Sequence, residues 1–188
     1  MRRKSAKPRQ ITLHGKRVFL RSPSPADYQE FASLMMASAR VYRGLVPRFK
    51  GREQFEDYLE RCRGDDFFGF LICRNEDRTI VGNINLFNII RRGLQSACIG
   101  YHVGASHARQ GLATEALQLL IRFAFNKARL HRVEADIQPG NVPSIALVRR
   151  AGFSCEGLSR RYVKISGKWR DHERWALLVE DWRRLCHQ

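Results

Sequence analysis

The stretch EALQLLIRFAFNKARL has polar residues at only a few, regularly spaced positions. Glu115, Gln118, Arg122, Asn126 and Arg129 recur every three or four residues, and the positions between them are mostly apolar. Residues at this spacing share one face of an α-helix, so the stretch predicts a helix with a single polar stripe. The rest of its surface has to be covered, and a β-sheet offers an apolar face broad enough to cover it. The chain is therefore expected to fold as a sheet with helices packed on it.

The rest of the chain supplies further strands and helices. Strand patterns occur in GKRVFLRSPSP, which stops at its prolines, and in FFGFLICRN, TIVGNINLFNII, QSACIGYHVG and HRVEADIQ. Helices are expected from Asp27 to about Ala39, from Arg52 to Arg63, from about Leu112 and from Asn141 to Ala151. The last two strands, SRRYVKI and KWRDHERWALLV, are joined by Ser166 and Gly167, which favour a hairpin turn. No repeat or linker interrupts residues 11–188, so we expect one mixed α/β domain built on one sheet.

The charge of the chain indicates an anionic ligand or partner. Lysine and arginine total 34 against 18 acidic residues, a net charge of +16. Such a charge attracts nucleic acid, an anionic cofactor or an acidic membrane surface. The alternative is that it serves solubility alone. The basic start, MRRKSAKPRQ, is followed by no apolar segment, so residues 1–10 are expected to be a flexible arm rather than a secretory signal. No apolar run approaches the roughly 20 residues of a membrane span, and we expect no membrane association.

The cysteines indicate neither disulfides nor a metal site. There are five, an odd number, and none is in CxxC spacing. We therefore expect a cytoplasmic protein without a metal. Separately, we expect a monomer or a dimer.

The turn before the long helix is built from small residues. Gly111 and Ala113 leave the first helical N–H groups uncovered, and those groups have no partner within the helix. They also carry the positive end of the helix dipole, so a phosphate can approach them closely, with Arg109 and Gln110 adding side-chain donors. The alternative is a tight strand-to-helix turn that merely needs glycine. The sequence has neither GxxxxGK[ST] nor GxGxxG, so the turn is not one of those two phosphate-binding loops.

A second motif, NVPSIALVRRAGF, predicts a short and well-capped helix. Asn141 is a good N-cap, Pro143 lies in the first turn, and Gly152 follows the last turn. Ser144 also lies in the first turn, where its hydroxyl can reach a ligand lying between two strands. The alternative role of Ser144 is a hydrogen bond to its own helix backbone.

The two motifs together, GYHVGASHARQGLATEAL and NVPSIALVRRAGF, resemble the GNAT N-acetyltransferases, and the resemblance extends from Val18 to Trp182. Within that superfamily SACIGYHVG, LHRVEA and ISGKWRDH are most similar to the ribosomal-protein-alanine N-acetyltransferases. The resemblance implies an α/β (α+β) fold with a single mixed, mostly antiparallel, twisted sheet and helices on both faces. It also implies acetyl-CoA as cosubstrate. The residues expected to bind it are Tyr101, His102 and Val103 through the backbone, the loop Arg109, Gln110, Gly111, Leu112, Ala113 and Thr114, and Asn141.

This chain departs from the family pattern at two positions. Ala108 stands where the loop usually begins with glutamine or arginine, which matters little because backbone groups bind most of the phosphate. Val148 stands where many members carry a tyrosine that protonates the CoA thiolate. The ribosomal-protein subgroup places a serine at the position of Ser144, so the resemblance implies Ser144 as the general acid or a donor to the thiolate.

The acceptor amine must be neutral to attack, and an α-amino group has a pKa of about 8, so a modest base or a water chain suffices. A strand N–H near Val103 can stabilise the charge that develops on the thioester oxygen. Four residues are candidates for the base and also fit structural or solvated roles: His102, Glu134, Asp136 and Glu173. Four hairpin residues are expected to surround the acceptor, although cross-strand packing would also explain them: Tyr162, Trp169, Asp171 and His172.

The resemblance predicts an acetyl-CoA-dependent N-acetyltransferase acting on a protein α-amino group, of a ribosomal protein beginning with alanine. The acceptor would be met on a ribosome or an assembling subunit, with non-specific RNA contacts by the basic arm. Two alternatives stay open. One is a GNAT enzyme that acetylates a small-molecule amine, and the other is a basic ribosome- or RNA-binding module with weak catalysis.

Overall fold

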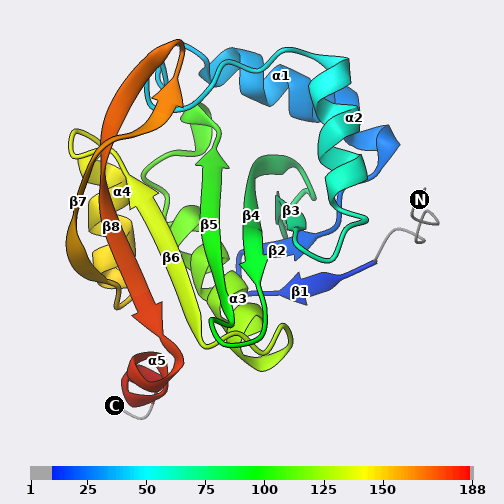
Figure 1. Ribbon diagram of the computed structural model, residues 1–188. Coiled ribbons are helices and arrows are strands. Elements are labelled where there is room, and N and C mark those ends of the chain that lie inside the picture. The colour runs from blue at the N-terminus through cyan, green and yellow to red at the C-terminus, as the bar shows by residue number, and fades with distance from the viewer. Residues whose placement is uncertain (1–9, 187–188) are drawn as a thin grey trace, which may run out of the picture.

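The computed structural model describes residues 10–186, and these form one eight-stranded sheet (Figure 1). The strand order is β1-β2-β3-β4-β5-β6-β8-β7, and every neighbouring pair is antiparallel except β5 and β6. The strands are β1 (Thr12–His14), β2 (Val18–Arg21), β3 (Phe68–Arg74), β4 (Ile80–Ile90), β5 (Ser96–Val103), β6 (Arg132–Ile137), β7 (Ser154–Ile165) and β8 (Lys168–Leu178).

Helices cover both faces of this sheet. The helices are α1 (Tyr28–Ser38), α2 (Arg52–Arg61), α3 (Leu112–Asn126), α4 (Val142–Arg150) and α5 (Val179–Cys186), with 3-10 turns η1 (Pro25–Asp27) and η2 (Ala105–His107). In Figure 1, α3 lies behind the sheet, and α1 and α2 lie at its top and right. The mixed, mostly antiparallel sheet with helices on both faces is confirmed.

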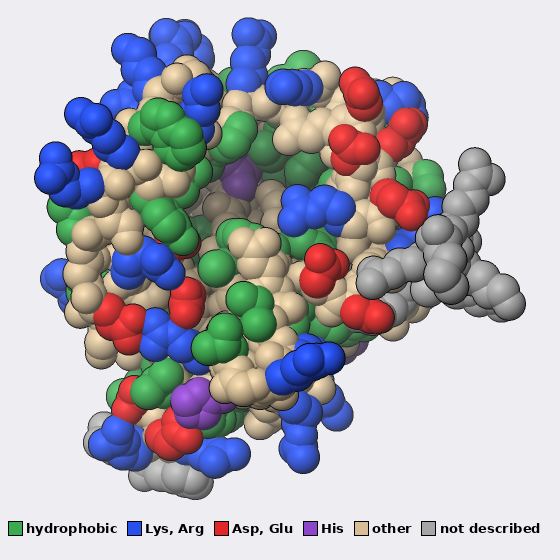
Figure 2. Space-filling view, viewed as in Figure 1, with side chains coloured by type: hydrophobic (Ala, Val, Ile, Leu, Met, Phe, Trp, Pro, Cys, Tyr) green, Lys and Arg blue, Asp and Glu red, His purple; other side chains and the backbone are tan. Residues whose placement is uncertain are grey.

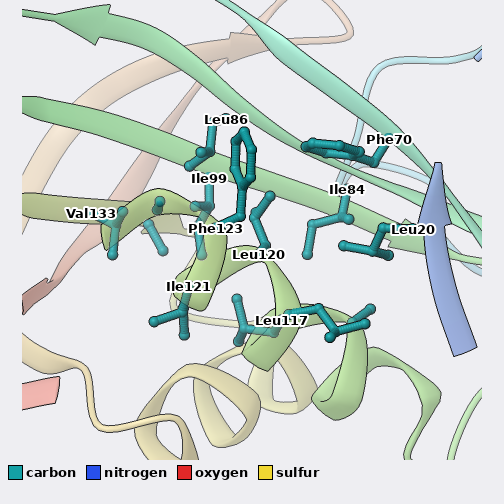
Figure 3. Close-up of a cluster of buried hydrophobic side chains, with 14 of the residues drawn as sticks. Leu20, Phe70, Ile84, Leu86, Ile99, Leu117, Leu120, Ile121, Phe123 and Val133 are labelled. Carbon is teal, nitrogen blue, oxygen red and sulfur yellow. The ribbon is translucent and has the colours of Figure 1, made fainter. Parts of the chain in front are cut away.

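The larger core lies between the sheet and α3. Leu117 and Leu120 of α3 are fully buried against Leu20, Phe70 and Ile84 of the strands, as Figure 3 shows. Burying one such leucine contributes about 2 kcal/mol, so the apolar sides of α3 hold the sheet and this helix together. The predicted polar stripe is confirmed within the helix, where Gln118 and Arg122 are exposed. Arg129 lies beyond the end of α3 and does not belong to the helical stripe.

A smaller core lies on the other face, under α1 and α2. Phe31 of α1 and Phe55 of α2 pack with Phe19 and Leu71 of the sheet. Phe19 and Leu20 are neighbours in β2 but belong to different cores, because successive strand residues point to opposite faces. Along β5 and β6 this alternation decides which side chains can face an acceptor.

Several element boundaries differ from those expected. The strand expected over residues 15–25 covers only Val18–Arg21, since Gly15–Arg17 form a turn to β1, and α2 ends at Arg61 rather than Arg63. β7 begins at Ser154, five residues before the expected start at Ser159, because Ser154 pairs with Ala176 of β8. The hairpin turn is confirmed at Ser166 and Gly167, which both have positive φ.

The α5 helix and the short β1 strand were not expected. α5 packs back on the core through Trp182, whose ring lies 5.2 Å from that of Phe125. The expected arm over residues 1–10 lies almost entirely outside the described residues. Among the residues that are described, no helix is long and apolar enough to span a membrane.

Candidate active site

The backbone pairing between β5 and β6 stops halfway along β5. The two strands pair in parallel from Ser96 with Arg132 to Cys98 with Glu134, and β5 then continues to Val103 without a partner in β6. In Figure 1 the two strands diverge toward their carboxyl ends. Apart from the Val103 carbonyl, which accepts a hydrogen bond from the Tyr42 hydroxyl, the backbone N–H and C=O groups on this side of Ile99–Val103 are therefore available to an extended ligand, which can bind as an added strand does.

The small-residue loop follows directly after this unpaired edge. Gly111 caps α3 with a φ of 74°, in the left-handed region, and no side chain caps the helix. A Cβ at Gly111 would lie 2.8 Å from Nη2 of Arg17. The left-handed backbone conformation explains why glycine stands there, and a larger residue would also displace the end of the Arg17 side chain. The uncapped N–H groups of α3 retain the features expected of an anion site, and phosphate binding there stays a prediction.

Arg17 and Glu115 hold this loop in place, and the sequence did not indicate this role for either of them. Nη1 of Arg17 donates to the carbonyl of Gln110 at 2.8 Å. The carboxylate of Glu115 accepts from the backbone N–H groups of Arg17 at 2.8 Å and Val18 at 3.4 Å. Burial acts to raise the pKa of Glu115, but these hydrogen bonds outweigh it and hold that pKa below its usual value. Only the polar character of Glu115 is visible locally, because its partners lie almost a hundred residues away.

Two grooves flank the loop on the side of β1 and β2. The larger, of about 660 Å³, lies between the turn that contains Arg17 and the exposed face of α3 at Thr114, Gln118 and Arg122. The smaller, of about 320 Å³, is lined by Arg17, Arg74 and Gln110 among others. Both grooves are therefore open beside the predicted phosphate site.

Tyr101, on the unpaired part of β5, contacts Ser144 at the start of α4. The Tyr101 hydroxyl donates to the backbone carbonyl of Ser144 at 3.4 Å. Burial raises the pKa of Tyr101 to about 12, against an opposing effect of its hydrogen bond with Ser144, so the phenol carries its proton at neutral pH. Asn141 is confirmed as the N-cap of α4, with its Oδ1 accepting from the Ser144 N–H at 3.4 Å. The structure therefore places two hydroxyl-bearing residues at the start of α4.

His102 lies on the opposite face of β5, toward α1. Its side chain is buried, and neither ring nitrogen has a hydrogen-bond partner among the described residues. Its ring centroid lies 4.4 Å from that of Tyr42, and the Tyr42 hydroxyl donates to the Val103 carbonyl at 2.7 Å. Burial lowers the pKa of His102 to about 4, so the imidazole is neutral at physiological pH. It therefore offers a lone pair on this face.

Asp136 lies on the same side of the sheet, one strand away. Nε of Arg174 lies 2.6 Å from its Oδ1, although this ion pair has no aligned hydrogen bond. Nη2 of Arg174 donates to Glu134 at 3.0 Å. Burial raises the pKa of Asp136 above its usual value, and the attraction of Arg174 only partly opposes that shift. Glu134 and Asp136 are two residues apart in β6 and share one face, where both contact Arg174. The sequence analysis did not name Arg174, although it lies two residues after His172 and on the same face of β8.

The hairpin residues expected at the acceptor end do not all gather together. The rings of Tyr162 and His172 lie 6.2 Å apart, and the guanidinium of Arg174 lies 4.8 Å from the Tyr162 ring centroid. Trp169 is instead 59% exposed near the hairpin tip, paired with Lys164. Asp171 accepts from the Arg161 N–H at 2.7 Å, where the β7–β8 register shifts, so its carboxylate stabilises the hairpin itself.

Of the base candidates, Glu173 is already committed elsewhere. Its carboxylate accepts from Nε1 of Trp175 at 2.9 Å. Glu134 is held by hydrogen bonds from Arg132 and Arg174. This leaves His102 and Asp136 as the remaining candidates. Figure 2 shows a hollow on this face with a histidine at its floor. Among the described residues, no three histidine, cysteine or acidic side chains gather as a metal site would need. The site therefore offers proton donors on one side of β5 and proton acceptors on the other.

The geometry of a strand edge, a small-residue loop and a helix start agrees with a known family. A family model described as the acetyltransferase (GNAT) domain matches residues 17–154. This match covers well over half of the chain, so the chain belongs to the GNAT acetyltransferases and is an acetyltransferase.

Individual relatives are similar over most of the chain. The probable N-acetyltransferase YjcK of Bacillus subtilis is 34% identical over 90% of this chain and 98% of its own length. The [ribosomal protein uS5]-alanine N-acetyltransferase of Escherichia coli is 35% identical over 61% of this chain and 59% of its own length. RimJ of Mycobacterium smegmatis, solved in complex with CoA-disulfide, superposes with a TM-score of 0.82 at 28% identity, covering 96% of this chain and 94% of that one.

Proposed function

We propose that this acetyltransferase transfers the acetyl group of acetyl-CoA to the α-amino group of a protein N-terminus, that of a ribosomal protein beginning with alanine. The observation that carries the proposal is the end of the β5–β6 pairing at Cys98 and Glu134, next to the uncapped start of α3. An extended thioester can complete the edge of β5 there while an amine approaches from the other face. The name of the E. coli uS5-alanine enzyme supports this choice of acceptor, and the CoA-disulfide bound to M. smegmatis RimJ supports the choice of cosubstrate.

The cosubstrate would be held mainly by backbone groups. Arg109, Gln110, Gly111, Leu112, Ala113 and Thr114 would surround the pyrophosphate, with the N–H groups of the first turn of α3 as donors. Tyr101, His102 and Val103 would pair with the pantetheine arm along the unpaired edge. Asn141 already caps α4, so its role toward the cosubstrate would be to fix the start of that helix.

The proposed reaction needs one proton acceptor and one proton donor. The amine nitrogen attacks the thioester carbonyl carbon, a C–N bond forms, and the C–S bond breaks. Asp136 would take the proton that the α-ammonium group must lose, because its buried carboxyl has a raised pKa. The neutral imidazole of His102 would hydrogen-bond the incoming amine. The nitrogen loses its second proton as the C–S bond breaks, and this proton would reach the leaving thiolate through the Ser144 hydroxyl, which ends protonated. Tyr101 would support Ser144 as a protonated phenol.

The acceptor residues would lie along the face that carries Tyr162, Asp136 and His172. Trp169 and Asp171 are farther toward the hairpin tip and would contact the acceptor beyond its first residue. This arrangement favours a polypeptide over a small amine, because a small amine would not extend to the hairpin. Acetyl-CoA and newly made ribosomal proteins are both cytoplasmic, so we propose a cytoplasmic location.

The test is a thiol-release assay with acetyl-CoA and peptides beginning with Ala, Ser or Met. We expect the alanine peptide to be turned over fastest, and mass spectrometry should place the acetyl group on the α-nitrogen. A matched peptide with a blocked α-amino group and one internal lysine should not react. Turnover of spermidine but of no peptide would favour a small-molecule amine instead. If nothing is turned over, a binding module becomes the better description.

A further inference from the structure

Positive charge gathers on two segments at the mouth of the hollow. Residues 39–51, which join α1 to α2, and residues 158–170 of the β7–β8 hairpin contain no aspartate or glutamate. We call eight of their cations the basic rim, and all eight are exposed: Arg40, Arg43, Arg48, Arg160, Arg161, Lys164, Lys168 and Arg170. Figure 2 shows lysine and arginine side chains around this part of the face and acidic ones on the side of α2.

The basic rim combines many cations with no acidic partner among the described residues, unlike the arginines that form ion pairs elsewhere in the molecule. Arg21, Arg74, Arg132, Arg174 and Arg184, for example, each form an ion pair with an aspartate or glutamate. None of the eight rim residues forms an ion pair with a described residue. Their field is therefore not cancelled locally, and it attracts anions toward the hollow.

The two segments lie on either side of the route to the proton acceptors. Nε2 of Gln138, just beyond β6, donates to the carbonyls of Gly44 at 2.9 Å and Leu45 at 3.2 Å, which ties the first segment to the end of β6. The second segment belongs to the hairpin whose β8 strand pairs with β6, and Tyr162 of that hairpin contacts Arg174. An amine that reaches Asp136 or His102 therefore comes from a chain that passes between the two segments.

We infer that the acceptor is a polypeptide with aspartate or glutamate within the first few residues after its N-terminus, and that the basic rim binds those carboxylates. The inference rests on the proposed transfer to a protein N-terminus. An extended chain advances roughly 3.3 Å per residue, so the residues that cross the rim are those a few positions after the N-terminus of the acceptor. The same charges repel polyamines and basic peptides, because like charges disfavour association.

The experiment compares three peptides of equal length. They share an Ala-Ser start and a labelled Gly-Tyr end, and their central segments are Glu-Asp-Glu, Gln-Asn-Gln and Lys-Arg-Lys. Fluorescence anisotropy measures binding to the full-length protein, and thiol release with acetyl-CoA measures turnover. The acidic peptide is expected to bind about 10-fold more tightly than the neutral one at low salt, from a few exposed charge pairs, and the preference should shrink as salt rises.

Two double variants separate the rim from the general charge of the protein. Lys164→Glu/Lys168→Glu reverses two exposed cations of the rim, whereas Lys127→Glu/Arg183→Glu reverses two exposed cations at the far end of the molecule. The rim variant should lose the preference for the acidic peptide or prefer the basic one. The control variant should keep the parent's ratio of acidic to neutral binding.

The two readouts keep the inference and the proposed function apart. A preference for the acidic peptide that is lost only in the rim variant supports the inference. If no peptide is turned over in that case, only the proposed function fails. Equal binding of the three peptides overturns the inference even if they are acetylated. An oligouridylate that displaces the acidic peptide, and that binds less tightly to the rim variant, would also overturn it and identify the rim as an RNA surface.

Discussion

At the scale of single residues, Gly111 is the position at which a larger side chain should weaken phosphate binding. Its φ is 74°, and a Cβ would meet Arg17 at 2.8 Å. Gly111→Val should raise the Kd for acetyl-CoA by at least about 10-fold, because a branched residue resists this backbone conformation and would move the N–H groups of the helix start. Calorimetric titration measures the effect. Gly93→Ala is the control, since a Cβ there meets nothing within 4 Å. Unchanged affinity in Gly111→Val would rule out this phosphate site.

Ser144 is the residue to test for proton donation to the thiolate. Ser144→Ala keeps the backbone N–H that Asn141 caps, so α4 should fold normally. We expect kcat to fall by about 10²-fold with little change in acetyl-CoA affinity, since the hydroxyl would act on the leaving group. The matched variant is Tyr101→Phe, which removes the hydroxyl bonded to the Ser144 carbonyl. A kcat for Ser144→Ala within a factor of about two of the parent would assign the proton to water or to Tyr101.

At the scale of elements, α5 is a helix whose role can be measured as stability. Trp182 contacts Phe125, and Leu185 lies so close to Gly152 that a Cβ there would be 2.3 Å from its Cδ1. Trp182→Ala should reduce the free energy of unfolding by about 2 kcal/mol, less than for a fully buried tryptophan. Urea denaturation measures this, with exposed Arg183→Ala as control. Equal stability of the two variants would mean that α5 does not hold the core.

The elements also show what sequence patterns can and cannot reveal. The polar stripe as far as Asn126, the N-cap Asn141 and the Ser166-Gly167 turn depend on residues a few positions apart, and each was predicted correctly. α5 was missed because eight residues carry too little periodicity to separate them from the end of β8. The loop contacts of Arg17 and the ion pair of Arg174 with Asp136 were missed for a different reason. They join distant strands and depend on a register that only the folded sheet defines.

At the scale of the whole molecule, His102 makes stability depend on pH. Its folded pKa of about 4 lies below the ordinary value of 6.5, so between these pH values the unfolded chain binds more protons than the folded one. Stability should therefore fall as pH drops from 6.5 toward 4, by up to about 3 kcal/mol from this group. His102→Phe should flatten that part of the curve, and urea denaturation across pH 4–8 measures both proteins. Parallel curves would show that His102 is not buried in its neutral form.

The net charge of +16 exceeds what acetyl-CoA or the basic rim needs, and part of it lies outside the described residues. Arg2, Arg3, Lys4, Lys7 and Arg9 form the basic arm. A basic ribosomal protein would be repelled as a free acceptor, so the charge is better explained if the acceptor is presented beside RNA. Phosphate contacts are not sequence-specific, and each one lost lowers the salt dependence of binding.

This explanation predicts that association with ribosomal subunits falls steeply as salt rises. Deleting residues 1–10 should weaken it without slowing acetylation of a free peptide, because the arm precedes the GNAT match that begins at residue 17. A second variant with the five arm cations replaced by glutamine keeps the length and should behave as the deletion does, if charge rather than chain length is responsible. Co-sedimentation with isolated subunits at several salt concentrations measures both. If the parent does not associate even at low salt, the arm does not bind RNA, and a free acceptor is favoured.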